Sequence, residues 1–278
     1  MTQLVSVLIP AHNEAAYIAD CLGALFASTA LPVGISVEVL VLANGCSDET
    51  AQIARSVLPP DGWHVEVLEL PEGGKLGALN AGDKIATGSV LVYLDADVLV
   101  SPALLGQLAA ALSGHAPRYA SGMPRISPAK SSVTKAYARF WAQLPFVCKG
   151  VPGFGVFSMN RVGRERWQEW PDIISDDTFA RLSFAPSERT SVPATYHWPM
   201  VEGFSNLVRV RRRQNAGVDE IAARFPHLLS NDEDRSLAPG ELWRLGLRDP
   251  LGFATYALVS LTVKTPLFKS RSRWARGR

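Results

Sequence analysis

The chain has 278 residues, of which 47% are apolar and 19% are charged, and its formal net charge at pH 7 is +2. This composition is typical of a folded protein and excludes a disordered chain, and so small a net charge argues against a nucleic-acid partner. The three cysteines, Cys21, Cys46 and Cys148, are widely spaced, which indicates neither a disulfide framework nor a zinc site. A reducing compartment, the cytoplasm, fits them best.

The first half of the sequence alternates apolar runs with helical periodicity. Runs typical of buried strands lie at residues 5–9, 37–42, 65–70 and 90–94, and helical segments follow at about 18–26, 47–58, 77–86 and 102–112. This alternation predicts a doubly wound, mostly parallel α/β sheet. Ligands bind such a sheet beyond the carboxyl ends of its strands. We therefore expect the polar clusters at 10–14, 43–48 and 95–97 to converge at one edge.

The second half has weaker periodicity. Beyond Tyr119 glycine and proline become frequent, which predicts an α+β extension that shares one body with the first half. We expect a main domain over residues 1–215, with halves at 1–115 and 116–215, and a C-terminal helical extension with a basic tail over 216–278.

Three segments bear on membrane contact. The run from Leu4 to Ala11 lacks a basic leader and continues into polar residues, so we interpret it as a buried strand and not as a signal peptide. The stretch 251–268 is apolar on balance but interrupted, which favours an interfacial or protein-packed helix over a membrane span. The tail 269–278 carries five cations and no carboxylate, which suits either contact with acidic lipid or a solubilising terminus.

Two carboxylates stand at the end of the fourth apolar run, in Asp95-Ala96-Asp97. Mg²⁺ and Mn²⁺ prefer oxygen ligands and keep coordination positions open for phosphate oxygens, so one or two carboxylates suffice for such an ion. Bound there, the ion would neutralise the charge on a departing diphosphate. The tripeptide alone also fits a turn or a helix cap.

Four ordered motifs place the tripeptide in context. They are VSVLIPAHNE at 5–14, EVLVLANGCSDET at 38–50, GKLGALNAG at 74–82 and VLVYLDADV at 90–98. In this order and spacing the sequence resembles the family-2 glycosyltransferases over residues 4–112, and again around 153–182. The resemblance implies a GT-A fold and an inverting transfer of a sugar from a nucleoside diphosphate sugar to a hydroxyl acceptor, in polysaccharide or glycolipid synthesis.

The resemblance also implies a donor site. The nucleotide base and ribose of the donor would be lined by Pro10, Ala11, His12, Asn13 and Glu14. Lys75, which follows two glycines, would lie near the donor phosphates, Asp95 and Ala96 near the ribose or sugar, and Asp97 with Asp95 at the Mg²⁺ or Mn²⁺ ion.

One position departs from the family pattern. Family members often carry an acidic residue where this chain has Ala43, and that carboxylate helps to hold the base or ribose. Either Asn44 or Asp48 compensates, or the preference for one nucleotide is relaxed. A UDP-sugar is the favoured donor.

Inverting transfer needs a general base for the acceptor hydroxyl, and a carboxylate serves well. Asp176-Asp177, before a helix-like segment, resembles the acidic pair that begins a helix in this family, and Asp177 is our candidate for the base, with Asp176 beside it. A pair of aspartates is also a good helix N-cap. The stretch 153–155, Gly-Phe-Gly, favours catalysis because it resembles the family's glycine-containing strand beside the acceptor.

Two further groups are candidates. In some GT-A enzymes a late histidine completes the metal shell, and His197 would serve here, although lone histidines are more often structural. Arg211, within the arginine cluster 209–213, would clamp donor phosphates, or else lie on a solvated basic helix face. The cluster resembles the Gln-x-x-Arg-Trp motif of processive members, but the tryptophan is absent.

Two rival functions share parts of this pattern. A sugar nucleotidyltransferase normally has a glycine-rich basic loop after its first strand, whereas this chain has Ala11-His12-Asn13-Glu14. A non-catalytic nucleotide-sugar-binding subunit would explain Ala43. We expect a cytoplasmic enzyme with a free or lipid-linked hydroxyl acceptor, in contact with the inner face of the cytoplasmic membrane through its C-terminus.

Overall fold

The computed structural model describes residues 3–28, 31–233 and 237–268, so the basic tail lies outside the described residues. The first half contains β1 (Gln3–Ala11), α1 (Ile18–Phe26), β2 (Ile35–Asn44), α2 (Thr50–Ser56), β3 (His64–Leu70), α3 (Lys75–Ile85), β4 (Val90–Leu94), β5 (Leu99–Val100) and α4 (Leu104–Ala111). The second half contains β6 (Tyr119–Ile126), α5 (Ser132–Trp141), α6 (Pro145–Cys148), β7 (Val156–Asn160), α7 (Arg161–Arg164), α8 (Asp176–Leu182), the 3₁₀ helix η1 (Pro186–Glu188), β8 (Arg189–Trp198), α9 (Phe204–Arg224), the 3₁₀ helix η2 (Pro226–Asn231), α10 (Pro239–Arg248) and α11 (Pro250–Val263).

One eight-stranded sheet runs through both halves, in the order β3-β2-β1-β4-β7-β6-β8-β5. Strands β1 to β4 are mutually parallel, and β6 is parallel to β8. The other three pairings, β4 with β7, β6 with β7 and β5 with β8, are antiparallel. The sheet is therefore mixed and mostly parallel, as the sequence predicts, and the antiparallel β7 joins the second half to the first.

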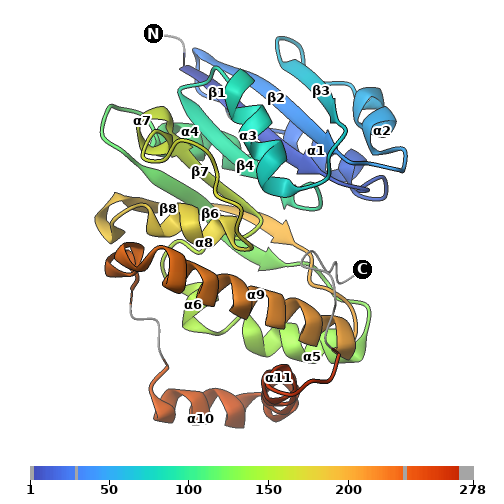
Figure 1. Ribbon diagram of the computed structural model, residues 1–278, viewed down its shortest axis with the longest axis vertical. Coiled ribbons are helices and arrows are strands. Elements are labelled where there is room, and N and C mark those ends of the chain that lie inside the picture. Colours follow the sequence, from blue (N-terminus) through green and yellow to red (C-terminus); the bar gives the residue numbers. More distant parts are fainter. Residues whose placement is uncertain (1–2, 29–30, 234–236, 269–278) are drawn as a thin grey trace.

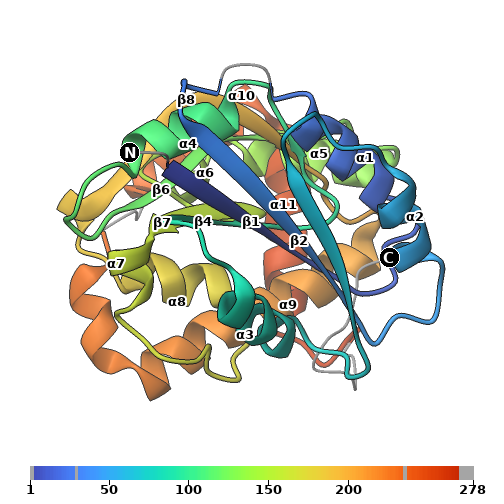
Figure 2. The same cartoon turned by 90° about the horizontal axis from the view of Figure 1, so that it is seen from above.

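Helices cover both faces of this sheet, as Figure 2 shows from above. Alternate residues of β1 and β2 pack on one face against α1, α2 and α4, and the residues between them pack on the other face against α3 and α8. Because the central strands are buried on both faces, they consist of continuous apolar runs, which is typical of parallel sheets.

Helices α5, α6, α9, α10 and α11 form a separate layer. Residues of α5, α6, α9 and α11 share a third apolar cluster, centred on Phe140, Trp141 and Val259. In Figure 1 this layer lies below the sheet, and α10 and α11 lie farthest from it. The predicted C-terminal helical segment is therefore present. Within the described part of the chain no helix is both long and apolar enough to cross a bilayer.

Element boundaries differ from the expected ones at several helices, among them the two that follow β2 and β3. The helix expected at 47–58 spans only Thr50–Ser56, because the Asp48 carboxylate accepts the Thr50 backbone N–H at 3.1 Å and holds the preceding residues in a turn. The helix expected at 77–86 begins at Lys75, directly after Gly74, whose φ of 145° belongs to the region that favours glycine. The second difference matters because it puts Lys75 at a helix start.

Candidate active site

Buried Asn44 ties together the loops at the strand ends. Its side-chain amide donates to the carbonyls of Ala11, at 3.0 Å, and Leu42, at 3.1 Å, and its Oδ1 accepts the backbone N–H of Gly74 at 2.9 Å. The ring of His12 reaches the Asn44 carbonyl, with Nδ1 2.6 Å from the oxygen. The predicted donor residue Asn44 thus acts as a brace between β1, β2 and the loop before α3.

The loop after β1 is held by residues that follow β2. Asn13 has a positive φ of 54°, and its Oδ1 accepts the backbone N–H of Ser47 at 2.7 Å. The backbone N–H of Glu14 donates to Thr50 Oγ1 at 2.7 Å, and Asp48 accepts the N–H of Ala15 at 3.1 Å. Two of the three polar clusters expected at this edge are therefore in direct contact.

Lys75 links this edge to two carboxylates from distant parts of the chain. Its Nζ lies 2.7 Å from Asp95 Oδ1, after β4, and 2.8 Å from Asp176 Oδ2, at the start of α8. Burial alone would lower the pKa of Lys75, but the charges of Asp176 and Asp95 outweigh it and raise the pKa above its ordinary value. Lys75 is therefore a fixed positive charge between the first half of the chain, which carries Asp95, and the second half, which carries Asp176.

Asp177 is held in place by its neighbours at the start of α8. Its Oδ1 accepts the Ser175 hydroxyl at 2.8 Å and the Thr178 backbone N–H at 2.7 Å. Burial and the adjacent Asp176 raise the pKa of Asp177, although Ser175 and Lys75 partly oppose them. A carboxylate with a raised pKa is a stronger base than an ordinary one.

A glycine brings the acceptor-side strand up to the pair Asp95 and Asp97. The backbone N–H of Asp95 donates to the carbonyl of Gly155 at 2.8 Å. Gly155 has a φ of 79°, and a Cβ there would lie 2.6 Å from the Trp198 ring and 3.0 Å from Val98. Only glycine fits this close approach, so the Gly-Phe-Gly stretch does lie beside the strand-end carboxylates.

The candidate metal ligands are two carboxylates with a histidine nearby. Asp97 is half-buried, and exposed His197 stands opposite Leu99 in the β5–β8 pairing, two residues beyond Asp97. No group of three His, Cys, Asp or Glu side chains able to hold a metal occurs among the described residues. Two carboxylates that leave room for phosphate oxygens fit Mg²⁺ or Mn²⁺, which needs few protein ligands.

Arg211, the expected phosphate-binding residue, belongs to the long helix α9. Its neighbour Arg212 donates to carbonyls at the end of α11, including that of Thr265 at 2.7 Å. The same helix approaches the site at Gly217, where a Cβ would lie 2.9 Å from Ser175. The arginine cluster is therefore part of a packed helix.

Two residues that position the site were missed from the sequence: Ser175 and Thr178, which hold Asp177. Their signal was a Ser-Asp-Asp-Thr run at a helix start, where hydroxyl and carboxylate side chains commonly bond one another.

Comparison with known proteins agrees with this geometry. The family model for glycosyl transferase family 2 matches residues 6–177. The glycosyltransferase AglE of Haloferax volcanii is 38% identical over 93 residues, which are 34% of this chain and 30% of that protein. The chain spans about a third or less of the length of the curated relatives it matches: it covers 30–32% of the first three and 10% of a chondroitin synthase of Pasteurella multocida.

Solved structures of GT-A glycosyltransferases share the fold. The mannosyltransferase PcManGT from Pyrobaculum calidifontis, solved with GDP-Man and Mn²⁺, has a TM-score of 0.57 and 21% identity, over 94% of this chain and 75% of that one. The glucosyl-3-phosphoglycerate synthase of Mycobacterium tuberculosis, solved with Mn²⁺, UDP and glucosyl-3-phosphoglycerate, has a TM-score of 0.51 and 21% identity, over 84% and 82% of the two chains. With a family model that matches more than half of its residues, the chain belongs to glycosyl transferase family 2, and its fold is GT-A.

Proposed function

We propose that this chain transfers a sugar from a nucleoside diphosphate sugar to a hydroxyl acceptor, with inversion at the anomeric carbon. The observation that carries the proposal is the position of Lys75, 2.7 Å from Asp95 and 2.8 Å from Asp176. One partly buried cation, 25% exposed, thereby joins the strand-end carboxylates, where a donor would bind, to the acidic pair that would act on the acceptor.

In this proposal the charged groups of the site have distinct tasks. Asp177 accepts the proton of the acceptor hydroxyl as its oxygen attacks the anomeric carbon from the side opposite the diphosphate. Lys75 orients Asp95 and Asp176 and adds positive charge near the leaving group. Residues 10–14, held by Ser47 and Thr50, form the wall against which the nucleotide binds.

Asp97 and Asp95 would hold a Mg²⁺ or Mn²⁺ ion, with His197 as a further candidate ligand, and this ion would supply charge neutralisation for the diphosphate. The nucleotide itself is left open by the neighbours, since one was solved with GDP-Man and another with UDP. We propose UDP as the first nucleotide to test.

Calorimetry tests the donor site. UDP and GDP are titrated with Mn²⁺ or with EDTA into wild type, Asp97→Ala and Asp61→Ala, a control in an exposed turn of the first half. We expect metal-dependent binding of one nucleotide, lost in Asp97→Ala and kept in Asp61→Ala. Binding that is equal in EDTA, or that survives in Asp97→Ala, contradicts the assignment of the metal ligands. If neither UDP nor GDP binds, the assignment of the donor site is contradicted.

We also propose that the enzyme works at a membrane surface, against which the C-terminal helices lie. Exposed apolar side chains gather on α10 and α11: Trp243, Leu247, Leu251, Leu258 and Leu261 are 56–78% exposed. Exposed cations, Arg244, Arg248 and Lys264, accompany them. An exposed apolar face beside cations is typical of helices that lie in the interface of an anionic bilayer.

Co-sedimentation with anionic vesicles tests this contact. The double substitution Trp243→Ser and Leu258→Ser removes apolar area from the face. The control, Leu58→Ser, removes a leucine from the first half that is even more exposed, at 86% against 67% and 56%. We expect roughly a tenfold loss of vesicle binding in the double variant and none in the control. Equal binding by all three proteins would remove the basis of the proposal.

A further inference from the structure

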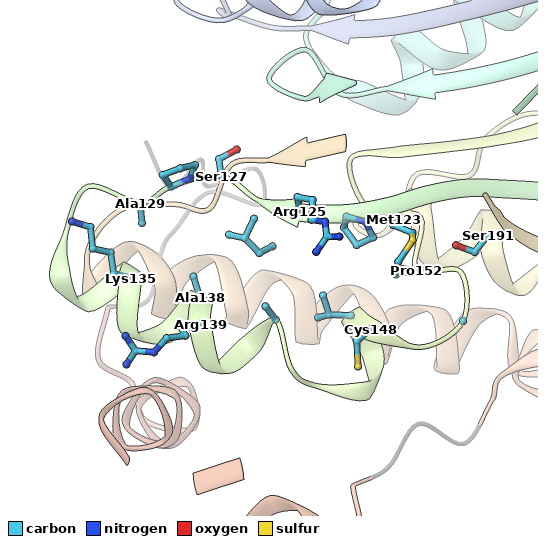
Figure 3. A pocket seen from close by; sticks show the side chains of 16 residues that line it. Met123, Arg125, Ser127, Ala129, Lys135, Ala138, Arg139, Cys148, Pro152 and Ser191 are labelled. Atoms are coloured by element: carbon cyan, nitrogen blue, oxygen red, sulfur yellow. The ribbon is translucent and has the colours of Figure 1, made fainter. Parts of the chain in front are cut away.

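A cavity of about 580 Å³ opens beside β6, on the acceptor side of the molecule. β7 pairs with β6 only at Tyr119 and Ala120, so residues 123–126 of β6 have no partner strand on that side. Figure 3 shows how this stretch of β6, α5 and α6 surround the space, with the side chains of Met123, Arg125 and Cys148 among those that line it. We call this space the β6 groove.

The lining of the β6 groove combines apolar walls with positive charge. Arg125, Lys135 and Arg139 line it, and no Asp or Glu among the described residues does. Arg139 is already neutralised by Asp249, at 2.7 and 2.6 Å. Arg125 and Lys135 are exposed and form no ion pair within the described part of the chain. The groove therefore presents two uncompensated cations, and an anion is the complementary occupant.

Apolar side chains also line the β6 groove. Met123, Ile126, Val147 and Pro152 contribute to it from β6, from α6 and from the loop before β7. Apolar walls of this kind favour a ligand that also has an apolar portion, because burial of that portion removes it from water.

The groove lies close to the candidate active site along two paths. Pro152, in its lining, is three residues before Gly155, whose carbonyl binds Asp95. Arg125 stands opposite His197 in the β6–β8 pairing, and His197 stands opposite Leu99 of β5. Two strand spacings separate Arg125 from Leu99, which is about 10 Å. A molecule that fills the groove is thus within reach of the carboxylates.

We propose that the β6 groove binds the acceptor, and that the acceptor is an amphiphile that carries a phosphate group. This inference rests on the proposed sugar transfer and names its acceptor class. The phosphate binds Arg125 and Lys135, and the apolar chain lies along Met123 and Val147. The wall of the groove also meets the C-terminal helices, because Arg139 of α5 binds Asp249 at the start of α11. An acceptor anchored in a membrane would reach the groove from that side.

A binding measurement without donor separates this inference from the proposed function. The probes are octyl phosphate, used below the concentration at which it forms micelles, glycerol 3-phosphate, which lacks the chain, and octyl glucoside, which lacks the charge. We expect octyl phosphate to bind roughly tenfold more tightly than either of the other two. Equal binding of glycerol 3-phosphate overturns the apolar part of the proposal, and equal binding of octyl glucoside overturns the anionic part.

Substitutions locate the binding. Arg125→Gln with Lys135→Gln removes two positive charges from the groove, and Arg55→Gln with Lys84→Gln removes two from exposed ion pairs in the first half. We expect the groove variant to bind octyl phosphate at least about tenfold more weakly than the control variant. Equal affinities in the two variants would place the binding elsewhere.

Cys148 provides a test that needs no substitution. It is exposed and lines the groove, whereas Cys46 is half-buried and lies near the donor edge. Octyl phosphate at ten times its dissociation constant should slow alkylation of Cys148 about tenfold, by mass action, and leave Cys46 unchanged. Equal protection of both thiols, or of neither, contradicts the groove assignment. Because no donor is present, this result stands or falls separately from sugar transfer.

Discussion

Lys75→Met tests whether this partly buried cation holds the active site together. Lys75 contacts Asp176, whose side chain is 8% exposed, and Asp95, whose side chain is 33% exposed. Removal of one partner from a buried ion pair commonly costs about 3–5 kcal/mol. The solvent exposure of Asp95 weakens the contribution of the Lys75–Asp95 pair. We therefore expect the free energy of unfolding at pH 7.5 to fall by about 3 kcal/mol. Methionine keeps most of the volume of the side chain.

The pH dependence of this loss gives the sharper test. Without Lys75, whose charge lowers the pKa of Asp177, the pKa of Asp177 in the folded variant rises further above the unfolded value of about 4. A carboxyl whose pKa is higher in the folded than in the unfolded state does not destabilise the protein below the unfolded pKa. Its destabilising effect grows as the pH rises from the unfolded pKa to the folded pKa. Urea unfolding at pH 7.5 and 4.5 should therefore show a loss that shrinks in acid.

The matched control is Lys84→Met, which breaks an exposed pair with Glu169, with both side chains 69% exposed. Such pairs contribute about 0–1 kcal/mol, so this variant should unfold almost as the wild type does at both pH values. If Lys75→Met matched Lys84→Met at pH 7.5, or if its loss of stability did not depend on pH, Lys75 would not be what stabilises the two carboxylates.

Three further predictions concern the site. Asp177→Asn should keep the affinity for the donor, measured by calorimetry, and lower transfer by about 10²–10⁴-fold; normal turnover in this variant would exclude Asp177 as the base. Because burial and Asp176 raise the pKa of Asp177, kcat/KM should fall in acid with a pKa above the usual range for an aspartate. Asp176→Asn should move this acidic fall of kcat/KM to lower pH. A fall at the same pH in both proteins would contradict the effect of Asp176 on Asp177. Gly45→Ala, at a φ of 54° and with its Cβ 2.7 Å from the Gly73 backbone nitrogen, should destabilise the protein by about 1–3 kcal/mol in urea unfolding, and clearly more than Gly62→Ala, where the added Cβ meets open space.

The parts of the site that the sequence predicts are those with a local signal. Each apolar run in the first half became a strand, and the polar residues after β1, β2 and β4 gathered at one edge because parallel strands end together. The glycines before Lys75 and the stretch 153–155 likewise mark places where the backbone makes a close approach or a left-handed turn.

The parts that could not be predicted depend on contacts between distant residues. The sequence around Asn44 does not show whether its side chain holds the loops together or binds a ligand. Two of its hydrogen-bond partners, Ala11 and Gly74, are 33 and 30 residues away. The ion pair of Lys75 with Asp176 likewise forms only when β7 turns back antiparallel along β4 and carries the second half across the sheet. The β6 groove has the same origin, because it lies where β7 leaves β6.

The most direct test of the central claim is the release of nucleoside diphosphate from UDP-, GDP- and dTDP-sugars, with Mg²⁺ or Mn²⁺ and with EDTA, in wild type and Asp97→Ala. We expect metal-dependent release from one donor, and loss of this release in Asp97→Ala. Absence of release from every donor, together with absence of donor binding in calorimetry, would contradict sugar transfer by this chain.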